Sequence, residues 1–403
     1  MRRSAVNVMI ACGLATALTG AMTACSETSQ TARPVAGEQD RPTLVGWARL
    51  PAGSFVPGSE PSGSALGTEP INGVQPPFAH QPIQGFSGIV RNRDGSFHAL
   101  SDNGYGAKNN SADFVLRIHR ISPDFRTGKV RVHGGITLTD PNSFAHFPLT
   151  RADRVLTGAD FDPESLVRAP DGTYWVGDEF GPYLLHFDHA GRLLTKPIPV
   201  PGVKSKNSAE LEPGEKPNIG GSKGLENLAI SPDGATLYPM LEGPVTGDDP
   251  RDLRMYEFDL RTATFTGHPR TYRMQAPELA VADLVAVGES RFLSIERDNL
   301  KGDEAAVKKI YVVDTADRDQ DGRVDKTEVV DLLDIANPRQ LGFPGQTFRF
   351  PFFTIEAVTV LGPRTIGVLN DNNFPSDATR TPGRADDNEF IAVRLPKSLD
   401  AYR

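Results

Sequence analysis

Hydrophobic and polar residues alternate in short runs along most of this chain, a pattern typical of half-buried β-strands. The clearest runs come in pairs, at residues 162–179 and 224–242, and a Pro-Asp-Gly turn separates the two members of each pair. An apolar run, an Asp-Gly turn and a second apolar run predict a β-hairpin. Both stretches are therefore interpreted as hairpins.

The hairpin pattern recurs along the chain. Its five copies lie at residues 87–102, 162–179, 224–242, 283–296 and 355–371. Two further strands are predicted after each of the first four hairpins, one after the fifth, and a lone strand at 44–50 precedes them all. Repeats of this length predict an all-β β-propeller of five four-stranded blades, its ring closed by the N-terminal strand. A sixth, degenerate blade and an ordinary β-sandwich are the alternatives.

In each hairpin segment, one residue near the start of the sequence and one at its end have side-chain oxygen atoms that could bind a metal ion. The opening position holds an acid in four copies and serine in the first: Ser87, Glu164, Glu226, Asp283 and Glu356. The closing position is acidic in every copy: Asp102, Glu179, Glu242, Glu296 and Asp371. The start of one antiparallel strand lies beside the end of its partner, and the first strands of a propeller line its channel. We therefore expect these acids to converge at one mouth of the channel.

So many carboxylates can share one place only if they are protonated, paired with cations or bound to metal. Oxygen ligands without paired His or Cys favour a hard cation, Ca²⁺ before Mg²⁺. The nine acids are therefore predicted Ca²⁺ ligands, and Glu164, Glu179, Glu226 and Glu356 are the predicted catalytic residues. The alternative is that each acid caps the backbone of a neighbouring blade.

Three further residues are predicted to bind substrate. Lys223 lies three residues before Glu226, and Arg297 directly follows Glu296, so either could hold an anion beside the metal. Ser87 replaces the opening acid in the first repeat and could face the channel. The alternative for the two basic residues is simple solvated charge.

A second metal motif lies between two predicted strands of the fourth repeat. Its ligand places follow the twelve-position EF-hand loop: Asp317, Asp319, Asp321, the Arg323 carbonyl, Asp325 and Glu328, with Gly322 at the sixth position. Because the flanking segments are strands, the predicted Ca²⁺ would stabilise a turn on the face away from the acidic mouth. An acidic hairpin loop without an ion is the alternative.

The N-terminal region has the pattern of an export signal. Arg2 and Arg3 precede an apolar run at 6–18, and small residues lead to Cys25. Residues 1–24 are predicted to be a lipoprotein signal peptide, with Cys25 lipidated and 25–43 a flexible tether. The domain at 44–396 would then be extracytoplasmic and attached to the membrane only through lipid, with a tail at 397–403. A plain signal peptide and a secreted product are the alternative.

The net charge of the chain limits the classes of partner that it can bind. The formal net charge of −8 argues against nucleic acid, which requires a basic surface, and favours cations or a cation between protein and an anionic ligand. A small anionic or ester substrate is therefore predicted for a protein that acts as a monomer.

Several motifs resemble those of the phytase-like family, described as having esterase-like activity of phytase. The similar segments include Gly85-Phe-Ser-Gly-Ile, Glu164-Ser-Leu, Gly224-Leu-Glu-Asn-Leu-Ala and Ile355-Glu-Ala-Val, within residues 44–396. The resemblance implies an extracytoplasmic propeller that hydrolyses phosphoesters such as phytate. Propeller phytases cluster Ca²⁺ with Lys and Arg around phosphate, but their basic residues cannot be matched to this chain motif by motif.

Three functional hypotheses follow. The first is a Ca²⁺-dependent phosphoesterase acting at the acidic mouth. The second is a lactonase- or carboxylesterase-like propeller that polarises a carbonyl. The third is a non-catalytic, Ca²⁺-stabilised binding protein of the cell envelope.

Overall fold

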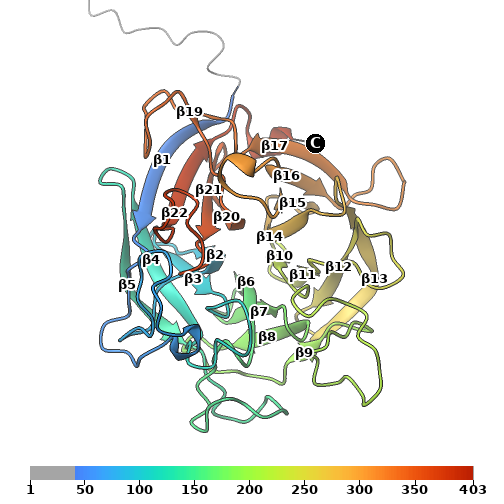
Figure 1. Ribbon diagram of the computed structural model, residues 1–403. Coiled ribbons are helices and arrows are strands. Elements are labelled where there is room, and N and C mark those ends of the chain that lie inside the picture. The colour runs from blue at the N-terminus through green and yellow to red at the C-terminus, as the bar shows by residue number, and fades with distance from the viewer. Residues whose placement is uncertain (1–40, 403) are drawn as a thin grey trace, which may run out of the picture. The chain divides into compact units, whose positions relative to one another are not determined.

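The computed structural model describes residues 41–402, and these residues form an all-β domain (Figure 1). Its helical content is limited to 3₁₀ turns at η1 (Ser64–Leu66), η2 (Gly302–Glu304) and η3 (Leu399–Ala401). Within this described range, no helix has the length and hydrophobicity needed to cross a bilayer. The predicted signal peptide, Cys25 and most of the predicted tether lie outside the described residues.

Three of the sheets have four strands in chain order and pair antiparallel throughout. One contains β6 (Pro163–Arg168), β7 (Tyr174–Asp178), β8 (Tyr183–Phe187) and β9 (Ile198–Pro199). The next contains β10 (Asn227–Ile230), β11 (Thr236–Met240), β12 (Asp252–Asp259) and β13 (Thr264–Arg273). The third contains β14 (Ala280–Ala286), β15 (Arg291–Arg297), β16 (Lys308–Asp314) and β17 (Asp325–Asp331).

The remaining strands of the described range belong to a ten-stranded sheet. One end holds β2 (Phe86–Arg91), β3 (Phe97–Ser101), β4 (Arg117–Asp124) and β5 (Lys129–Thr137). The other end holds β20 (Thr354–Gly362), β21 (Thr365–Asp371), β22 (Asn388–Arg394) and β1 (Thr43–Leu50). A single parallel pair, Arg49 with Lys129, joins the two ends. The short strands β18 (Ile335–Ala336) and β19 (Thr347–Phe348) lie at the edge of β1.

The N-terminal strand β1 is the outer strand beside β22, far from it in sequence. The two strands pair antiparallel from Thr43–Arg394 to Leu50–Asn388. Segment 44–50 thus occupies the place beside the last repeat that the sequence pattern left open.

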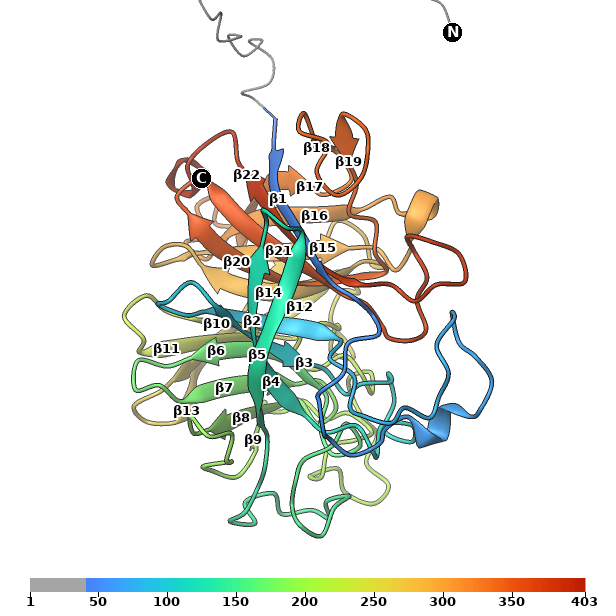
Figure 2. The same cartoon turned by 90° about the vertical axis from the view of Figure 1, so that its left-hand side faces the viewer.

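The sheets are arranged around a common centre, an arrangement of the β-propeller type (Figure 1). The first strand of each group contacts the first strand of the next, in the cyclic order β2, β6, β10, β14, β20. A cavity of about 200 Å³ is lined by residues from all five of these strands. Close approach at the centre requires small residues: a Cβ on Gly177 would lie 2.3 Å from Ser165 Oγ and 2.5 Å from Leu225 O. The longer connections between strands gather on one side of the ring (Figure 2).

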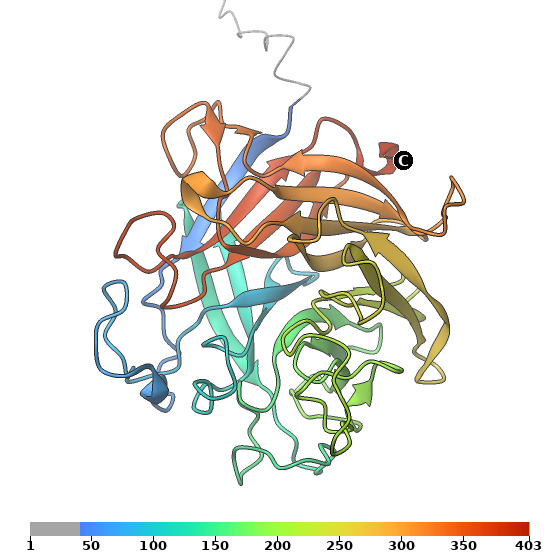
Figure 3. The ribbon, with the colours of Figure 1, turned by 45° about the vertical axis from the view of Figure 1, so that its right-hand side comes forward.

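The core lies between adjacent sheets, since each sheet buries apolar side chains on both faces. Leu100 and Ile118 of one sheet, for example, share a cluster with Leu166 and Val176 of the next. Each sheet fans outward from its first strand toward its last at the rim (Figure 3). The tail also packs, because Leu399 and Tyr402 join the cluster beneath β17 and β22.

Candidate metal centre

The hairpin register places the five opening residues at one equivalent point. In four hairpins that point is a β-bulge, where the pairing shifts at Ser87, Glu164, Asp283 and Glu356. Glu226 directly precedes β10 and takes the same place in the remaining hairpin. A bulge leaves one residue outside the ladder and re-aims its side chain. The repeats seen in the sequence therefore correspond to a β-bulge that recurs at the same place in the hairpins.

The closing residues also share one register position. The backbone N–H groups of Asp102, Glu179 and Glu242 donate to the carbonyls of Gly85, Asp162 and Gly224. Glu296 pairs with Val281, and Asp371 pairs with Thr354, two residues before their bulges. Opening and closing residues therefore lie at the same end of each hairpin.

Three overlapping groups of buried carboxylates form where the hairpins meet. In each group the ligand oxygens lie within 4.8 Å of one another. The groups are Asp162–Glu164–Glu179, Glu164–Glu226–Glu356 and Glu179–Glu226–Glu242. Because the groups share members, they form one continuous site. It unites Glu164, Glu179, Glu226, Glu242 and Glu356, which the sequence predicted as ligands, with Asp162, which it did not.

Asp102 and Asp371 flank this site. Asp102 accepts hydrogen bonds from Gly104 N at 2.8 Å and Gln84 Nε2 at 3.4 Å. Asp371 accepts from Asn373 N at 2.7 Å. Burial, followed by the nearby carboxylates, raises the pKa of both groups well above the usual range. We call the whole set the carboxylate cluster: Asp102, Asp162, Glu164, Glu179, Glu226, Glu242, Glu356 and Asp371.

Burial dominates the electrostatics of the carboxylate cluster. Removal from water disfavours the charged form of a carboxyl group, and a neighbouring carboxylate adds repulsion. Both effects, burial first, raise the pKa values of Glu164, Glu179 and Glu226 well above the usual range. The pKa of Glu356 is also raised by burial, although Arg297 and Ser87 oppose the shift. Without cations, burial favours the protonated form of these four groups.

Two basic side chains enter the carboxylate cluster. The Arg297 guanidinium is 4% exposed, and its Nη2 lies 3.1 Å from Glu356 Oε1 and 3.8 Å from Glu242 Oε1. Lys223 Nζ forms an ion pair with the other oxygen of Glu242. Ser87 Oγ donates to Glu356 Oε2 at 2.9 Å, so this hydroxyl orients a carboxylate. All three predicted substrate-binding residues therefore contact the cluster.

The donor set of the carboxylate cluster fits a hard cation. Glu179 Oε1 and Glu226 Oε1 are buried without a hydrogen-bond partner, as are both amide atoms of Asn227 beside them. Buried polar atoms ordinarily find partners, and orphaned ones indicate an absent water or ion. Oxygen ligands alone, most of them carboxylates, suit Ca²⁺.

Asp283 does not join the carboxylate cluster, contrary to the prediction. Its carboxylate accepts hydrogen bonds from Leu284 N and Val358 N, both at 2.8 Å, and so links β14 to β20. Aspartate is one methylene shorter than the glutamate found at this position in three other hairpins. Burial raises the pKa of Asp283 to about 7.

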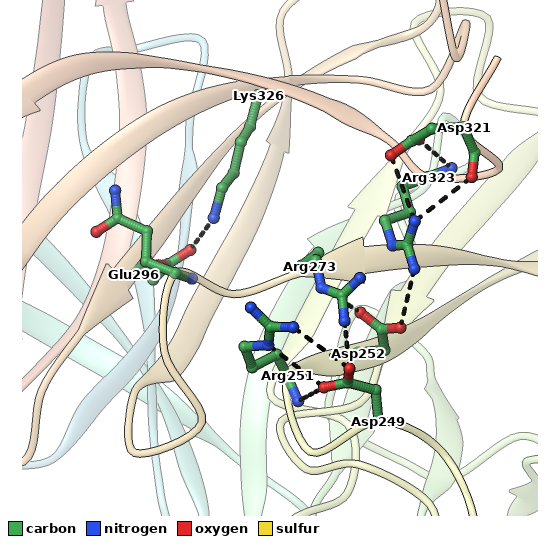
Figure 4. Close-up of polar contacts among 9 residues, drawn as sticks. Asp249, Arg251, Asp252, Arg273, Glu296, Asp321, Arg323 and Lys326 are labelled. Atoms are coloured by element: carbon green, nitrogen blue, oxygen red, sulfur yellow. Dashed lines mark hydrogen bonds and ion pairs between the residues drawn. The ribbon is translucent and has the colours of Figure 1, made fainter. Parts of the chain in front are cut away.

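Glu296 also stays out of the carboxylate cluster. It accepts hydrogen bonds from Tyr272 OH at 2.8 Å and Gln275 N at 2.8 Å, and Lys326 Nζ lies 2.6 Å away (Figure 4). β15 continues through Arg297, and successive side chains on a strand point to opposite faces. Since Arg297 faces the cluster, Glu296 must face away. In this hairpin the cationic side chain of Arg297 thus takes the place of the predicted ligand Glu296.

The EF-hand-like loop joins β16 to β17, at the strand ends opposite Glu296, as predicted. Asp317, Asp319 and Asp321 bring oxygens within 4.8 Å of one another. Gly322 has a φ of 82°, the left-handed conformation that the sixth position requires.

The later positions of this loop depart from the motif. Glu328 lies in the β16–β17 ladder, and Lys309 Nζ is 2.8 Å from its carboxylate, so it does not close the loop. Asp325 accepts from Arg318 N at 2.9 Å. The Arg323 side chain lies between Asp321 and Asp252 of β12 (Figure 4). The structure thus assembles only the first three predicted ligands.

Sequence reasoning missed two residues of the region. Asp162 lies two residues before Glu164, and the Asp-Pro-Glu spacing was the signal that could have identified it. Lys308 is fully buried, with Nζ 3.0 Å from Asp298 Oδ1 and hydrogen bonds to the carbonyls of Asp298 and Phe353. Burial, and then Arg297, lowers the pKa of Lys308 to about 8. No sequence motif marked this lysine.

Comparison with known proteins gives a family and a distant relative. The family model described as "Phytase-like: Esterase-like activity of phytase" matches residues 81–374. An "Uncharacterized secreted protein" of Arthroderma benhamiae is 33% identical over 126 residues, which cover 26% of this chain and 25% of that protein.

Solved structures give weaker likenesses. A protein of unknown function from Dyadobacter fermentans is 11% identical with a TM-score of 0.44, covering 88% of this chain and 99% of that one. Regucalcin from Agrobacterium tumefaciens, a calcium-binding protein, is 13% identical with a TM-score of 0.36, covering 87% and 98%. At these TM-scores the likeness supports no statement about activity.

Proposed function

Because the chain belongs to the phytase-like family, we propose that it is an extracytoplasmic, Ca²⁺-dependent hydrolase of phosphate esters that acts at the carboxylate cluster. The proposed scaffold is a five-bladed propeller closed by β1, acting as a monomer. The observation that carries the proposal is the meeting of buried carboxylates with Arg297 at one end of the ring. The description of the Arthroderma benhamiae relative as secreted supports export, and a lipid anchor at Cys25 remains part of the proposal.

The residues proposed to hold cations are those of the three carboxylate groups. Glu179 and Glu226 each belong to two groups and have an unpartnered oxygen, so they are the proposed central ligands. Bound Ca²⁺ would neutralise the carboxylates, bind phosphate oxygens and lower the pKa of a water. Ca²⁺ at Asp317, Asp319 and Asp321 is proposed as a separate, stabilising site.

The other roles belong to side chains of the chain itself. Arg297 presents a fixed guanidinium that can donate to a phosphate oxygen while still contacting Glu356. Lys223 is partly exposed and can reach an anion at the mouth of the site. A carboxylate of the cluster left without a cation would accept the proton of the attacking water. The Ser87 hydroxyl keeps Glu356 oriented.

Arg297 and Lys223 favour phosphate over a neutral acyl ester, because a carbonyl substrate offers these cations no anionic oxygens. The family description nevertheless names esterase-like activity, so an ester or lactone hydrolase is the second candidate. The two chemistries can be separated by substrate.

The test is hydrolysis of phytate, a simple phosphomonoester and a short acyl ester, each with Ca²⁺ and with chelator. We expect Ca²⁺-dependent phosphate release that is abolished in the double variant Glu164→Gln plus Glu226→Gln. Glu278→Gln, at an exposed acid, is the matched control. Acyl-ester cleavage alone would favour the second candidate, no hydrolysis would favour a binding protein, and full activity of the double variant would place the site elsewhere.

A further inference from the structure

A groove lies at the end of the ring opposite the carboxylate cluster. It encloses about 850 Å³ and is formed by three hairpin turns: residues 92–96, 169–173 and 231–235. These turns join β2 to β3, β6 to β7 and β10 to β11, whose other ends carry the cluster. The groove is therefore separate from the proposed hydrolytic site, and its volume suits a small-molecule ligand.

The groove is lined by basic side chains in an acidic protein. The charged and titratable residues of its wall are Arg93, Asp94, His98, Arg120, Arg168, Asp171, Tyr174 and His189. The two acids are already occupied. Asp94 pairs with Arg120 and also accepts from Ser96, and Asp171 accepts from both the N–H and the hydroxyl of Thr173.

Arg168 is the basic residue best placed to bind an anion. Within residues 41–402, no carboxylate lies in ion-pair range of its guanidinium, which donates to the neutral Asn92 Oδ1 at 2.9 Å. Tyr174 OH and His98 Nδ1 lie 2.8 Å apart beside it. Burial, followed by Arg168 and Arg120, lowers the pKa of His98, so the wall is electropositive even with a neutral imidazole.

The groove has a rigid frame. The Arg168–Asn92 and Tyr174–His98 hydrogen bonds both cross from the β6–β9 sheet to the β2–β5 sheet. The third turn packs against the second, because a Cβ on Gly234 would lie 2.2 Å from Pro170 Cγ. A preformed site loses little conformational entropy when a ligand binds.

We propose that this groove is a second binding site, which holds a small molecule through a phosphate or carboxylate group placed between Arg168 and Arg120. Arg93 lies on the same wall and extends the positive surface for a ligand larger than one anionic group. This site does not depend on the chemistry of the carboxylate cluster.

The test uses the full-length protein, labelled with ¹³C in its histidine rings, titrated separately with inorganic phosphate and with acetate. An anion beside Arg168 and Arg120 favours the imidazolium form, so we expect binding to raise the pKa of His98 and shift its ring signals. Asp94 and Tyr174 also face His98, and neither is altered in the variants below. No shift of the His98 signals with either probe would overturn the proposal.

Variants locate the bound anion. Arg168→Ala is expected to weaken phosphate binding at least about tenfold, the loss of a charge-assisted hydrogen bond. Arg120→Gln is expected to weaken it as well, and exposed Arg126→Ala to leave it unchanged. Asn92→Ala removes the partner of Arg168 but keeps the cation, so binding should persist. If Asn92→Ala and Arg168→Ala weaken phosphate binding equally, Arg168 only links the two sheets and does not bind the anion.

The two ends of the ring must also respond separately. The double variant Glu164→Gln plus Glu226→Gln is expected to keep the phosphate-induced shift at His98 even if it hydrolyses nothing. Loss of the shift in that variant would place the anion at the carboxylate cluster and overturn the second site. Thermal unfolding of each variant checks that the fold is retained.

Discussion

Replacing Glu226 by glutamine is expected to stabilise the metal-free protein at pH 8 and to weaken its stabilisation by Ca²⁺. Glu226 belongs to two of the three carboxylate groups, and burial and its neighbours raise its pKa. The unfolded chain releases this proton near the ordinary value of 4.5, whereas the folded metal-free protein retains it to higher pH. Folded stability therefore falls as pH rises from about 4.5 through the raised pKa.

The size of the effect follows from the geometry. Two ionised carboxylates 4.8 Å apart repel by about 3 kcal/mol at an effective dielectric constant of about 20. Protonation relieves part of this repulsion, and each unit of raised pKa costs about 1.4 kcal/mol once pH exceeds the folded value. Glutamine removes both terms, so Glu226→Gln should raise the metal-free unfolding free energy by about 1–3 kcal/mol at pH 8. The gain should vanish near pH 4.5.

The assay is thermal and urea unfolding of the wild type, Glu226→Gln and the control Glu278→Gln at pH 4.5 and pH 8, each with chelator and with Ca²⁺. For the wild type, Ca²⁺ at a hundred times its Kd should add about 2.7 kcal/mol. The variant should gain less, since it lacks a central ligand. If Glu226→Gln destabilises the chelated protein at pH 8, or if both proteins gain equally from Ca²⁺, the idea of repelling carboxylates is refuted.

Three further outcomes are expected. In chelator, the wild-type unfolding temperature should fall between pH 5 and pH 8, because the raised pKa values make the folded state hold more protons; a rise would contradict the sign. Asp319→Ala should remove part of the Ca²⁺-dependent stabilisation but leave kcat/KM unchanged, which unfolding and hydrolysis assays measure together. Arg297→Ala should destabilise the chelated protein by about 3 kcal/mol in urea unfolding, since Glu356 and Glu242 lose their buried cation, whereas Arg126→Ala should have no effect.

The sequence predicted the all-β class and the equivalence of the hairpin ends because both depend on local rules. Asp-Gly turns fix which residues pair, and period-2 alternation fixes which face is buried. The equivalence of Glu164 and Glu356 is therefore readable from the repeats alone, although the bulges at which they lie were not predicted. The family resemblance also came from these hairpin ends, and the family model confirms it over residues 81–374.

Side-chain direction was less predictable because it depends on single residues. Glu296 and Asp283 occupy the right register positions. Glu296 faces away because its strand continues, and Asp283 is too short and accepts from Val358 N of β20 instead. Glu328 fits the loop motif, yet it is committed to the β17 ladder. A repeat alignment assigns a position to a residue; the neighbouring backbone decides where its side chain goes.

Because Arg297 enters the carboxylate cluster in place of Glu296, it changes how much negative charge in the cluster must be neutralised by other groups. Arg297 and Lys223 form ion pairs with Glu356 and Glu242, whereas no ion pair in the described range reaches Asp162, Glu164 or Glu179. Those remaining groups can be neutralised only by protons or by added cations, and the two compete for the same oxygens. Cation binding must therefore displace protons, so affinity rises with pH over the same range in which the metal-free fold weakens. The unpartnered oxygens of Glu179 and Glu226 are free to bind such a cation, whereas Arg297 already contacts Glu356 and Glu242. The proposed cation thus belongs beside Glu164, and the substrate anion beside Arg297.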